Sequence, residues 1–325
     1  MKKIIIGIQF GIAGLLLALN APAAPLTAGD PILLPGTTGG FDFIRIDTNQ
    51  DRLLLGHEAN KTMDVFDLAT KKLLKAVPTG TAQDAAVDVK RDRYYVSGND
   101  PGRMVIVNAS NLTVTAEVAM PTNTDLIAFD PVTSRIYECN DTAGQVWVID
   151  ADGKNIMTTI QYDGRGVEDL ALDPDYQHLY QAVKGANTIA VVDAANNNVL
   201  TNYPLAPDKG PHGIAIVPDN DGLLVACAGK LVMLDRSTGK IISTADTGAR
   251  VDEMAYDPGL HQAYCASRGG NISVVGVAAD KLTALGNVPD TATGSITVDP
   301  KTHIVWIAYV KSGQSFMQPF TPTAN

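Results

Sequence analysis

The sequence predicts an all-β protein: a seven-bladed β-propeller with four-stranded blades and a ring closed by the N-terminal strand. Three observations predict it. A short element that ends in Asp-Pro recurs about every 42 residues. Each copy holds β-type runs separated by turn residues. The last copy is one strand short, while an unassigned strand precedes the first copy.

The Asp-Pro element sets the repeat. It occupies 127–131, 170–174, 254–258 and 296–300, and 214–218 is the same element with Val in place of Asp. Successive prolines lie 43, 44, 40 and 42 positions apart. Two earlier copies, at 43–47 and 85–88, keep the pattern without proline. The chain therefore carries seven copies.

Each copy contains strand signals and no convincing helical stripe. A second strand such as 93–96 follows the Asp-Pro turn, then a Gly/Asn-rich loop such as 140–144 and a β-branched run such as 189–194. Four strands at this period are typical of a propeller blade. The predicted single domain, 24–325, has blades at about 41–80, 81–123, 124–165, 166–210, 211–250, 251–291 and 292–320, plus strand 31–35.

The two ends of the chain predict how the ring closes. The last copy stops after its third strand, near 316–320, and the segment 31–35 has no partner in its own copy. If this segment forms the outer strand of the seventh blade, no long strand edge stays open.

The first 23 residues have the layout of a secretory signal peptide. Lys2 and Lys3 precede the apolar run 4–19, and Ala21, Pro22 and Ala23 supply the cleavage site. The run is shorter than the roughly 20 residues of a membrane helix. We therefore expect a periplasmic or secreted protein without a membrane span after cleavage.

Composition excludes several classes of protein. The formal net charge of −10 argues against nucleic acid as the main partner. Three cysteines, none in a Cys-x-x-Cys motif, exclude a disulfide-stapled scaffold and a zinc ribbon. Cys227 and Cys265 fall in adjacent predicted blades, so a disulfide between them is an alternative to buried thiols.

The repeats resemble the exported YVTN-type β-propeller repeat proteins. The stretches that carry the resemblance are 190–193, 210–216 and 230–240, and the name-giving motif is degraded to forms such as the one at 95–98. The resemblance implies that the first strand of each copy lines a central channel and that ligands lie at one mouth of it. It does not imply an activity, because this fold serves unrelated functions.

Aligning the copies on Asp-Pro gives two sets of equivalent positions at the start of the inner strands. The first set holds Asp42, Gln83, Asp125, Glu168, His212, Asp252 and Gly294, and the second holds Phe43, Asp84, Leu126, Asp169, Gly213, Glu253 and Ser295. A ring of carboxylates around a narrow channel is costly, so we expect raised pKa values, a bound cation or basic neighbours.

The first set predicts a cation site. Oxygen ligands suit calcium or magnesium, and Asp42, Asp125, Glu168 and Asp252 are the candidate ligands, with His212 as a candidate acid or base. The alternative interpretation is that these side chains are solvated or accept hydrogen bonds from backbone N–H groups of neighbouring blades. Two nearby arginines, at positions 165 and 250, would then pair with the acids.

Other residues are candidates for ligand binding at the same mouth. Asp84, Asp169 and Glu253 come from the second set, and Lys184 and Arg268 come from equivalent loops after second strands. His57 lies in the corresponding loop of the first blade, and it is a candidate catalytic residue together with His212.

Two functions follow from these features. The first is an exported, monomeric, non-catalytic propeller that binds a small molecule, peptide or envelope protein at the channel mouth or rim. The second is a metal-assisted hydrolase, lactonase or lyase, in which a cation at the carboxylate ring polarises a carbonyl. The sequence lacks Gly-x-Ser-x-Gly and His-Glu-x-x-His motifs, so it favours the first.

Overall fold

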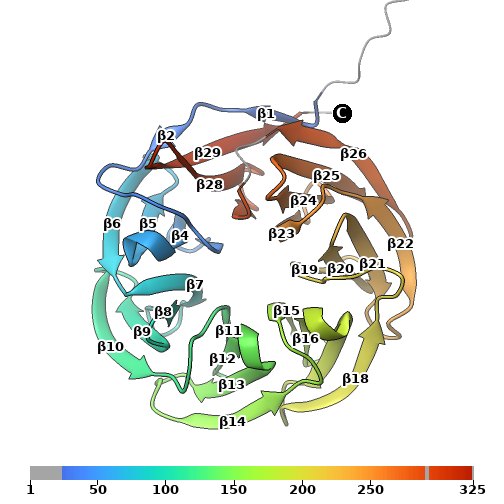
Figure 1. Ribbon diagram of the computed structural model, residues 1–325, viewed down its shortest axis with the longest axis horizontal. Helices are drawn as coiled ribbons and strands as arrows, with labels where there is room; N and C mark the ends of the chain where they lie inside the picture. The colour runs from blue at the N-terminus through green and yellow to red at the C-terminus, as the bar shows by residue number, and fades with distance from the viewer. Residues whose placement is uncertain (1–23, 290–292, 324–325) are drawn as a thin grey trace, which may run out of the picture.

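Seven antiparallel sheets surround a common centre in the computed structural model, which describes residues 24–289 and 293–323 (Figure 1). Six have four strands, and in the seventh two short strands together take the place of the fourth. The predicted seven-bladed propeller is confirmed. The predicted signal peptide, 1–23, lies outside the described residues. No helix in the described part is long and apolar enough to cross a membrane.

The blades follow the chain in order, with the first strand innermost. Blades 1 to 3 are β3 (Ile44–Asp47), β4 (Arg52–His57), β5 (Thr62–Asp67) and β6 (Lys72–Pro78); β7 (Thr81–Asp88), β8 (Arg93–Asn99), β9 (Arg103–Asn108) and β10 (Thr113–Ala119); and β11 (Ile127–Asp130), β12 (Arg135–Asn140), β13 (Gln145–Asp150) and β14 (Ile156–Gln161). Short 3-10 helices η1 (Glu58–Asn60), η2 (Asp141–Ala143) and η3 (Lys184–Ala186) follow the second strands of blades 1, 3 and 4.

The remaining blades repeat this order. Blades 4 to 6 are β15 (Val167–Asp173), β16 (His178–Val183), β17 (Thr188–Asp193) and β18 (Asn198–Pro204); β19 (Ile214–Val217), β20 (Gly222–Cys227), β21 (Lys230–Asp235) and β22 (Ile241–Asp246); and β23 (Val251–Asp257), β24 (Gln262–Ser267), β25 (Asn271–Val277) and β26 (Leu282–Pro289). Blade 7 has β27 (Ile296–Val298), β28 (Val305–Lys311) and β29 (Gln314–Pro322).

The N-terminal segment closes the ring on blade 7, as predicted. β2 (Ile32–Leu33) pairs with β29, with Ile32 opposite Met317. Pairing also begins earlier than the sequence indicates, because β1 (Leu26–Ala28) runs antiparallel to the end of β29. Pro31 interrupts the two strands, since proline has no backbone N–H to donate.

The aspartate of the repeated element fixes the turn between the first two strands. The Asp130 carboxylate accepts a hydrogen bond from the backbone N–H of Val132 (2.8 Å) and one from the Thr133 hydroxyl (2.6 Å). Asp47 and Asp257 accept from backbone N–H groups two residues later in the same way. These Asx turns explain why Asp ends the inner strand in most copies.

The hydrophobic core lies between the blades and not at the centre of the molecule. Seven clusters each join two neighbouring blades. The cluster between blades 7 and 1 includes Leu34, Phe66, Trp306 and Met317, all almost fully buried. Every blade is thus packed on both faces, including the one that closes the ring.

All three cysteines contribute free, buried thiols to this packing. Cys227 lies in β20 and Cys265 in β24, in the adjacent blades 5 and 6. Of the two alternatives from the sequence, the structure therefore contains the buried thiols.

Candidate functional site

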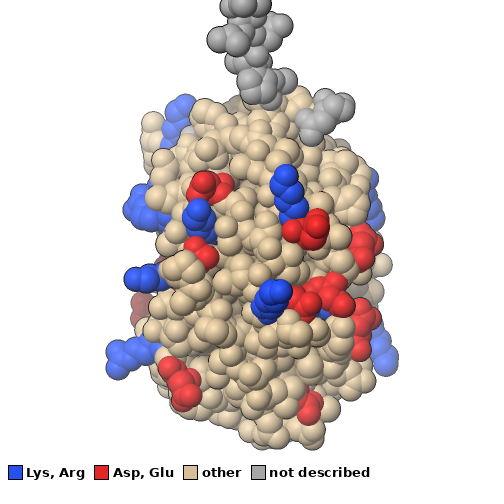
Figure 2. All heavy atoms as spheres, turned by 90° about the vertical axis from the view of Figure 1, so that its right-hand side faces the viewer, with Lys and Arg blue, Asp and Glu red and all other residues tan. Residues whose placement is uncertain are grey.

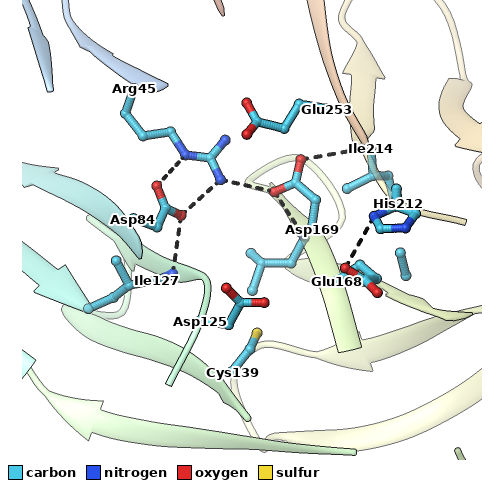
Figure 3. Close-up of polar contacts among 12 residues, drawn as sticks. Arg45, Asp84, Asp125, Ile127, Cys139, Glu168, Asp169, His212, Ile214 and Glu253 are labelled. Atoms are coloured by element: carbon cyan, nitrogen blue, oxygen red, sulfur yellow. Dashed lines mark hydrogen bonds and ion pairs between the residues drawn. The ribbon is translucent and has the colours of Figure 1, made fainter. Parts of the chain in front are cut away.

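An arginine from blade 1 crosses the centre of the propeller (Figure 3). The Nε and Nη2 atoms of Arg45 donate to the two carboxylate oxygens of Asp84 in blade 2, at 2.8 and 2.9 Å. Nη2 also reaches Asp169 in blade 4, at 3.2 Å. The pKa of Arg45 is raised because these two carboxylates outweigh the opposing effect of burial. Bidentate contacts of this kind are the strong form of ion pair.

Sequence reasoning missed Arg45, although the aligned copies contain a signal for it. The equivalent positions, defined by pairing with the second strands, hold small residues in the other blades: Ala86, Ala128, Ala171, Ala215, Ala255 and Thr297. A long cationic side chain at the one remaining position stands out once the copies are compared there.

Carboxylates of the second set, one in every second blade, join their blade to the next one. Asp84, Asp169 and Glu253 belong to blades 2, 4 and 6, and each accepts a hydrogen bond from the backbone N–H of Ile127, Ile214 and Ile296, respectively, in the next blade (3.2, 3.4 and 3.1 Å). The alternative interpretation of the sequence expected backbone contacts of this kind for the four acids of the first set, whereas these three belong to the second set.

The same three blades have irregular inner strands. Register shifts lie between Ala82 and Ala85 in β7, between Val167 and Leu170 in β15, and between Val251 and Met254 in β23. An extra residue in a strand redirects the side chains beside it. The irregularity falls at the acidic pairs and lets the second acid of each pair reach the next blade.

Glu253 keeps one oxygen without a partner. Its Oε2 accepts from Ile296, and Oε1 has no hydrogen-bond partner in the described part of the chain. Burial and the nearby Asp42 carboxylate raise its pKa well above the usual range, against the lowering effect of Arg45. Burial also raises the pKa of Asp169, although Arg45 opposes this shift.

The end of the channel where the inner strands begin, which we call the upper mouth, carries two groups of paired charges. Glu168 accepts from Lys184 Nζ at 3.0 Å and lies 3.2 Å from His212 Nδ1. Burial raises the pKa of Glu168, but His212 and Lys184 outweigh it and the net shift is downward. His212 is therefore held by a carboxylate and belongs to this charged cluster.

Asp252 and Arg268 form the second group, with contacts of 2.7 and 2.5 Å. This bond raises the pKa of Arg268. The expected partners of the acids are thus wrong: Lys184 and Arg268, not the nearby arginines, pair with Glu168 and Asp252. Arg250 instead donates to the backbone carbonyl of Arg268 (2.9 Å).

Asp42 is an acid of this mouth that forms no ion pair with the described residues. No Lys, Arg or His of the described residues lies within 4.0 Å of its carboxylate. Burial, Asp125 and Asp252 raise its pKa well above the usual value, in that order. The four predicted metal ligands do not form one ligand set: in the described ranges, no group of three or more His, Cys, Asp or Glu side chains is arranged to hold an ion.

His57 does not join the mouth, in contrast to its predicted position. It is fully buried at the seam between blades 1 and 7, where Nδ1 contacts Asp64 (2.7 Å) and Nε2 contacts the Thr38 carbonyl (3.0 Å). The Ser315 hydroxyl lies 3.3 Å from Nε2. Because a carbonyl accepts only, Nε2 holds a proton and cannot take one from Ser315. Phe41 stacks on the His57 ring. His57 therefore has a structural role at this seam.

Below Arg45, the channel widens into a cavity of about 500 Å³, which we call the lower chamber. Inner strands of six blades line it, and it extends to Pro300 in the turn after β27. Most of its lining residues are apolar, although polar atoms contribute about as much of the exposed lining as apolar ones, and Arg45 and Asp169 form its inner end. Arg45 thus separates an acidic upper mouth from a chamber lined mostly by apolar residues.

Solved structures with this architecture share the fold at low identity. A chain of the mitotic checkpoint complex aligns with a TM-score of 0.78 and 12% identity, covering 99% of this chain and 100% of that one. A chain of Kuenenia stuttgartiensis hydrazine synthase aligns with a TM-score of 0.76 and 15% identity, covering 90% and 99%. The RRP9 WD40 repeats align with a TM-score of 0.76 and 11% identity, covering 91% and 100%.

The comparisons by sequence match a smaller part of the chain than the comparisons by structure. No curated protein sequence matches the chain. The family model described as the cytochrome D1 heme domain matches residues 45–214, slightly more than half of the chain, from β3 to the start of β19. These comparisons support a propeller family and do not single out the YVTN-type repeats. The chain belongs to the cytochrome D1 heme domain family.

Proposed function

We propose that this protein is an exported, non-catalytic binding protein that holds a positively charged group of a small molecule or peptide at the upper mouth. One observation carries the proposal: Asp42 lies among Asp125 and Asp252 and forms no ion pair of its own. A site with excess negative charge and partial burial attracts a cation and gains by pairing with it.

The surrounding pairs suit binding better than catalysis. Lys184 and Arg268 are about half exposed (45 and 52% of their side chains) and hold Glu168 and Asp252 in place. His212, the candidate acid or base, is engaged by Glu168. The arrangement therefore offers fixed charges around a ligand, and its histidine is already engaged by a carboxylate.

The test uses a matched pair of peptides. Acetyl-Gly-Lys-Gly-amide carries one ammonium group, and the same peptide with norleucine in place of lysine keeps the aliphatic chain without the charge. By calorimetry, we expect the lysine peptide alone to bind, and Asp42→Asn to weaken it about tenfold. Asp246→Asn removes the same charge from the outer strand β22, where the side chain is 83% exposed, and should leave binding unchanged.

Equal binding of the two peptides, or an equal effect of the two substitutions, would contradict the proposal. Calcium and magnesium are tested in parallel, since the sequence predicted them as ligands. If the ions displace the lysine peptide, the same carboxylates hold a metal instead, and the second candidate, metal-assisted hydrolysis, gains its missing support.

The family description raises the question of heme. Heme iron is ligated by His, Cys, Met or Tyr. The lower chamber offers no His or Cys from the described residues, and its Met254 packs between blades 5 and 6. Tyr256 lines the chamber, but burial raises the pKa of its hydroxyl to about 12, away from the phenolate form that ligates iron. Arg45 blocks the inner end of the chamber. At the upper mouth, His212 stands among charged side chains and not apolar walls. The residues present do not fit a heme.

A further inference from the structure

The lower chamber is a second site, separate from the upper mouth. Its volume of about 500 Å³ lies within the range of small-molecule pockets, roughly 300–1,000 Å³. Its walls contain Ile46, Val87, Phe129, Tyr256 and Val298, from five different blades. The apolar part of this lining gains free energy when a ligand displaces water from it.

The width of the lower chamber depends on small side chains in the inner strands. Ala86, Ala128, Ala255 and Thr297 line the chamber at the positions where blade 1 has arginine. Bulky side chains at these positions would fill the space. The chamber is thus encoded in the repeat and is not a packing defect at one site.

The inner end of the chamber offers one polar group for recognition. Within the described residues, the hydrogen bonds of Arg45 use Nε and Nη2 and leave the two N–H groups of Nη1. Arg45 lines the chamber, and 32% of its side chain is exposed. Asp169 is already occupied, because it accepts from Arg45, Leu170 and Ile214. The polar group that remains for a ligand is therefore a hydrogen-bond donor, Nη1 of Arg45.

The charge around Arg45 decides which acceptor fits. Asp84 and Asp169 together balance the guanidinium and exceed it by one charge, and Glu253 lies next to them (Figure 3). An anionic ligand would be repelled by this layer. An ammonium group would lose hydration against the apolar side chains of the chamber and face the N–H groups of Arg45. A neutral oxygen avoids both costs.

We propose that the lower chamber binds an uncharged, mainly apolar small molecule whose carbonyl or hydroxyl oxygen accepts a hydrogen bond from Arg45. The site is independent of the upper mouth, because Arg45 and its two carboxylates lie between them. Its ligand enters from the face that carries the Asp-Pro turns, where Pro300 borders the chamber.

The test compares four probes with one ring and different polar groups: cyclohexanone, cyclohexanol, cyclohexylammonium and cyclohexanecarboxylate. Methyl NMR signals of Ile44, Ile46, Val87 and Val298 report on occupancy of the chamber. We expect saturable shifts with cyclohexanone and cyclohexanol. Both charged probes should bind at least about tenfold more weakly.

Two substitutions narrow the chamber from different blades, Ala128→Leu and Thr297→Leu, and either should abolish the shifts. Two variants are used so that a folding defect in one does not decide the outcome. Ala116→Leu makes the same change on the exposed outer strand β10 and should keep ketone binding.

Charged probes that bind as tightly as the ketone, or shifts that survive both narrowing substitutions, would overturn the proposal. Asp42→Asn separates this site from the upper mouth: it should leave cyclohexanone binding intact whether or not the lysine peptide binds.

Discussion

At the scale of single residues, the centre of the propeller depends on one cation. Arg45 compensates two buried carboxylates, so removing it leaves both charges uncompensated. We predict that Arg45→Met lowers the free energy of unfolding by about 3–5 kcal/mol in urea titrations. Lys230→Met breaks an exposed pair with Asp246 and should change it little. A small loss at Arg45, comparable to that at Lys230, would contradict this role.

A second residue-scale prediction concerns Glu138 in β12. It is fully buried, and neither carboxyl oxygen has a hydrogen-bond partner among the described residues. Burial raises the pKa of Glu138 to about 8. A hydrogen bond from the nearby Thr124 hydroxyl would lower this pKa, but that hydroxyl donates to the Gly98 carbonyl instead (2.9 Å). The equivalent residue in blade 4, Gln181, donates to the backbone carbonyls of Glu168 and Asp169.

The way in which Glu138 changes the free energy of unfolding with pH follows from the protons that the folded and unfolded states bind. Between the ordinary glutamate pKa and about 8, the folded state holds a proton that the unfolded state has lost, so Glu138 costs stability progressively as pH rises. We expect Glu138→Gln to stabilise the protein over this range, with a gain that grows by up to about 1.4 kcal/mol per pH unit. Urea titrations of both proteins at pH 5, 6.5 and 8 would measure it. A gain independent of pH would show that the carboxyl is ionised throughout.

The upper mouth has its own pH dependence. Because the pKa of Asp42 is raised, its carboxylate is lost at a higher pH than that of an ordinary aspartate. Affinity for the lysine peptide should therefore fall as the solution becomes mildly acidic, and Asp42→Asn should remove most of that dependence. Calorimetry from pH 7.5 downward checks this, and an unchanged pH profile in the variant would assign the binding to other groups.

At the scale of elements, the closing strand gives a matched comparison. Leu34 is buried between blades 7 and 1, and its neighbour Leu33 is 44% exposed. We predict that Leu34→Ala costs about 2–5 kcal/mol of unfolding free energy and that Leu33→Ala costs little. Amide exchange in β29 should accelerate only in the first variant. Similar costs for both would mean that the N-terminal segment does not hold the ring shut.

The elements also show what the sequence could reveal. The repeat period, the Asp-Pro turns and the unassigned strand predicted the blades and the closure, because each is a local signal that recurs. The first part of the closing strand, β1, was missed because its only partner, β29, lies at the opposite end of the chain. The same limit applies to His57, whose partners Thr38 and Ser315 come together only at the seam.

The candidate site was predicted in part. Alignment of the copies found the acids at the inner-strand starts, since symmetry places equivalent positions together. It did not find which bases pair with them, because Lys184 and Arg268 reach Glu168 and Asp252 from loops whose paths the sequence does not specify. Arg45 could have been found in the same alignment, because it lies two positions after the second set of each copy.

At the scale of the whole molecule, charge and cavity are distributed unequally. The outer face in Figure 2 has acidic and basic side chains interspersed, without a continuous basic patch. The channel, in contrast, concentrates acids above Arg45 and apolar side chains below it. A propeller needs a packed core only between its blades, so its centre is free for binding at both ends.

The separation of the channel at Arg45 is the central claim, and a crystal structure of the protein soaked with both cyclohexanone and the lysine peptide tests it most directly. We predict ketone density beside Ala128 and Phe129, with its oxygen toward Arg45, and the lysine ammonium beside Asp42 on the other side of the guanidinium. Density for both probes on one side of Arg45, or an Arg45 side chain displaced from Asp84 and Asp169, would contradict the claim.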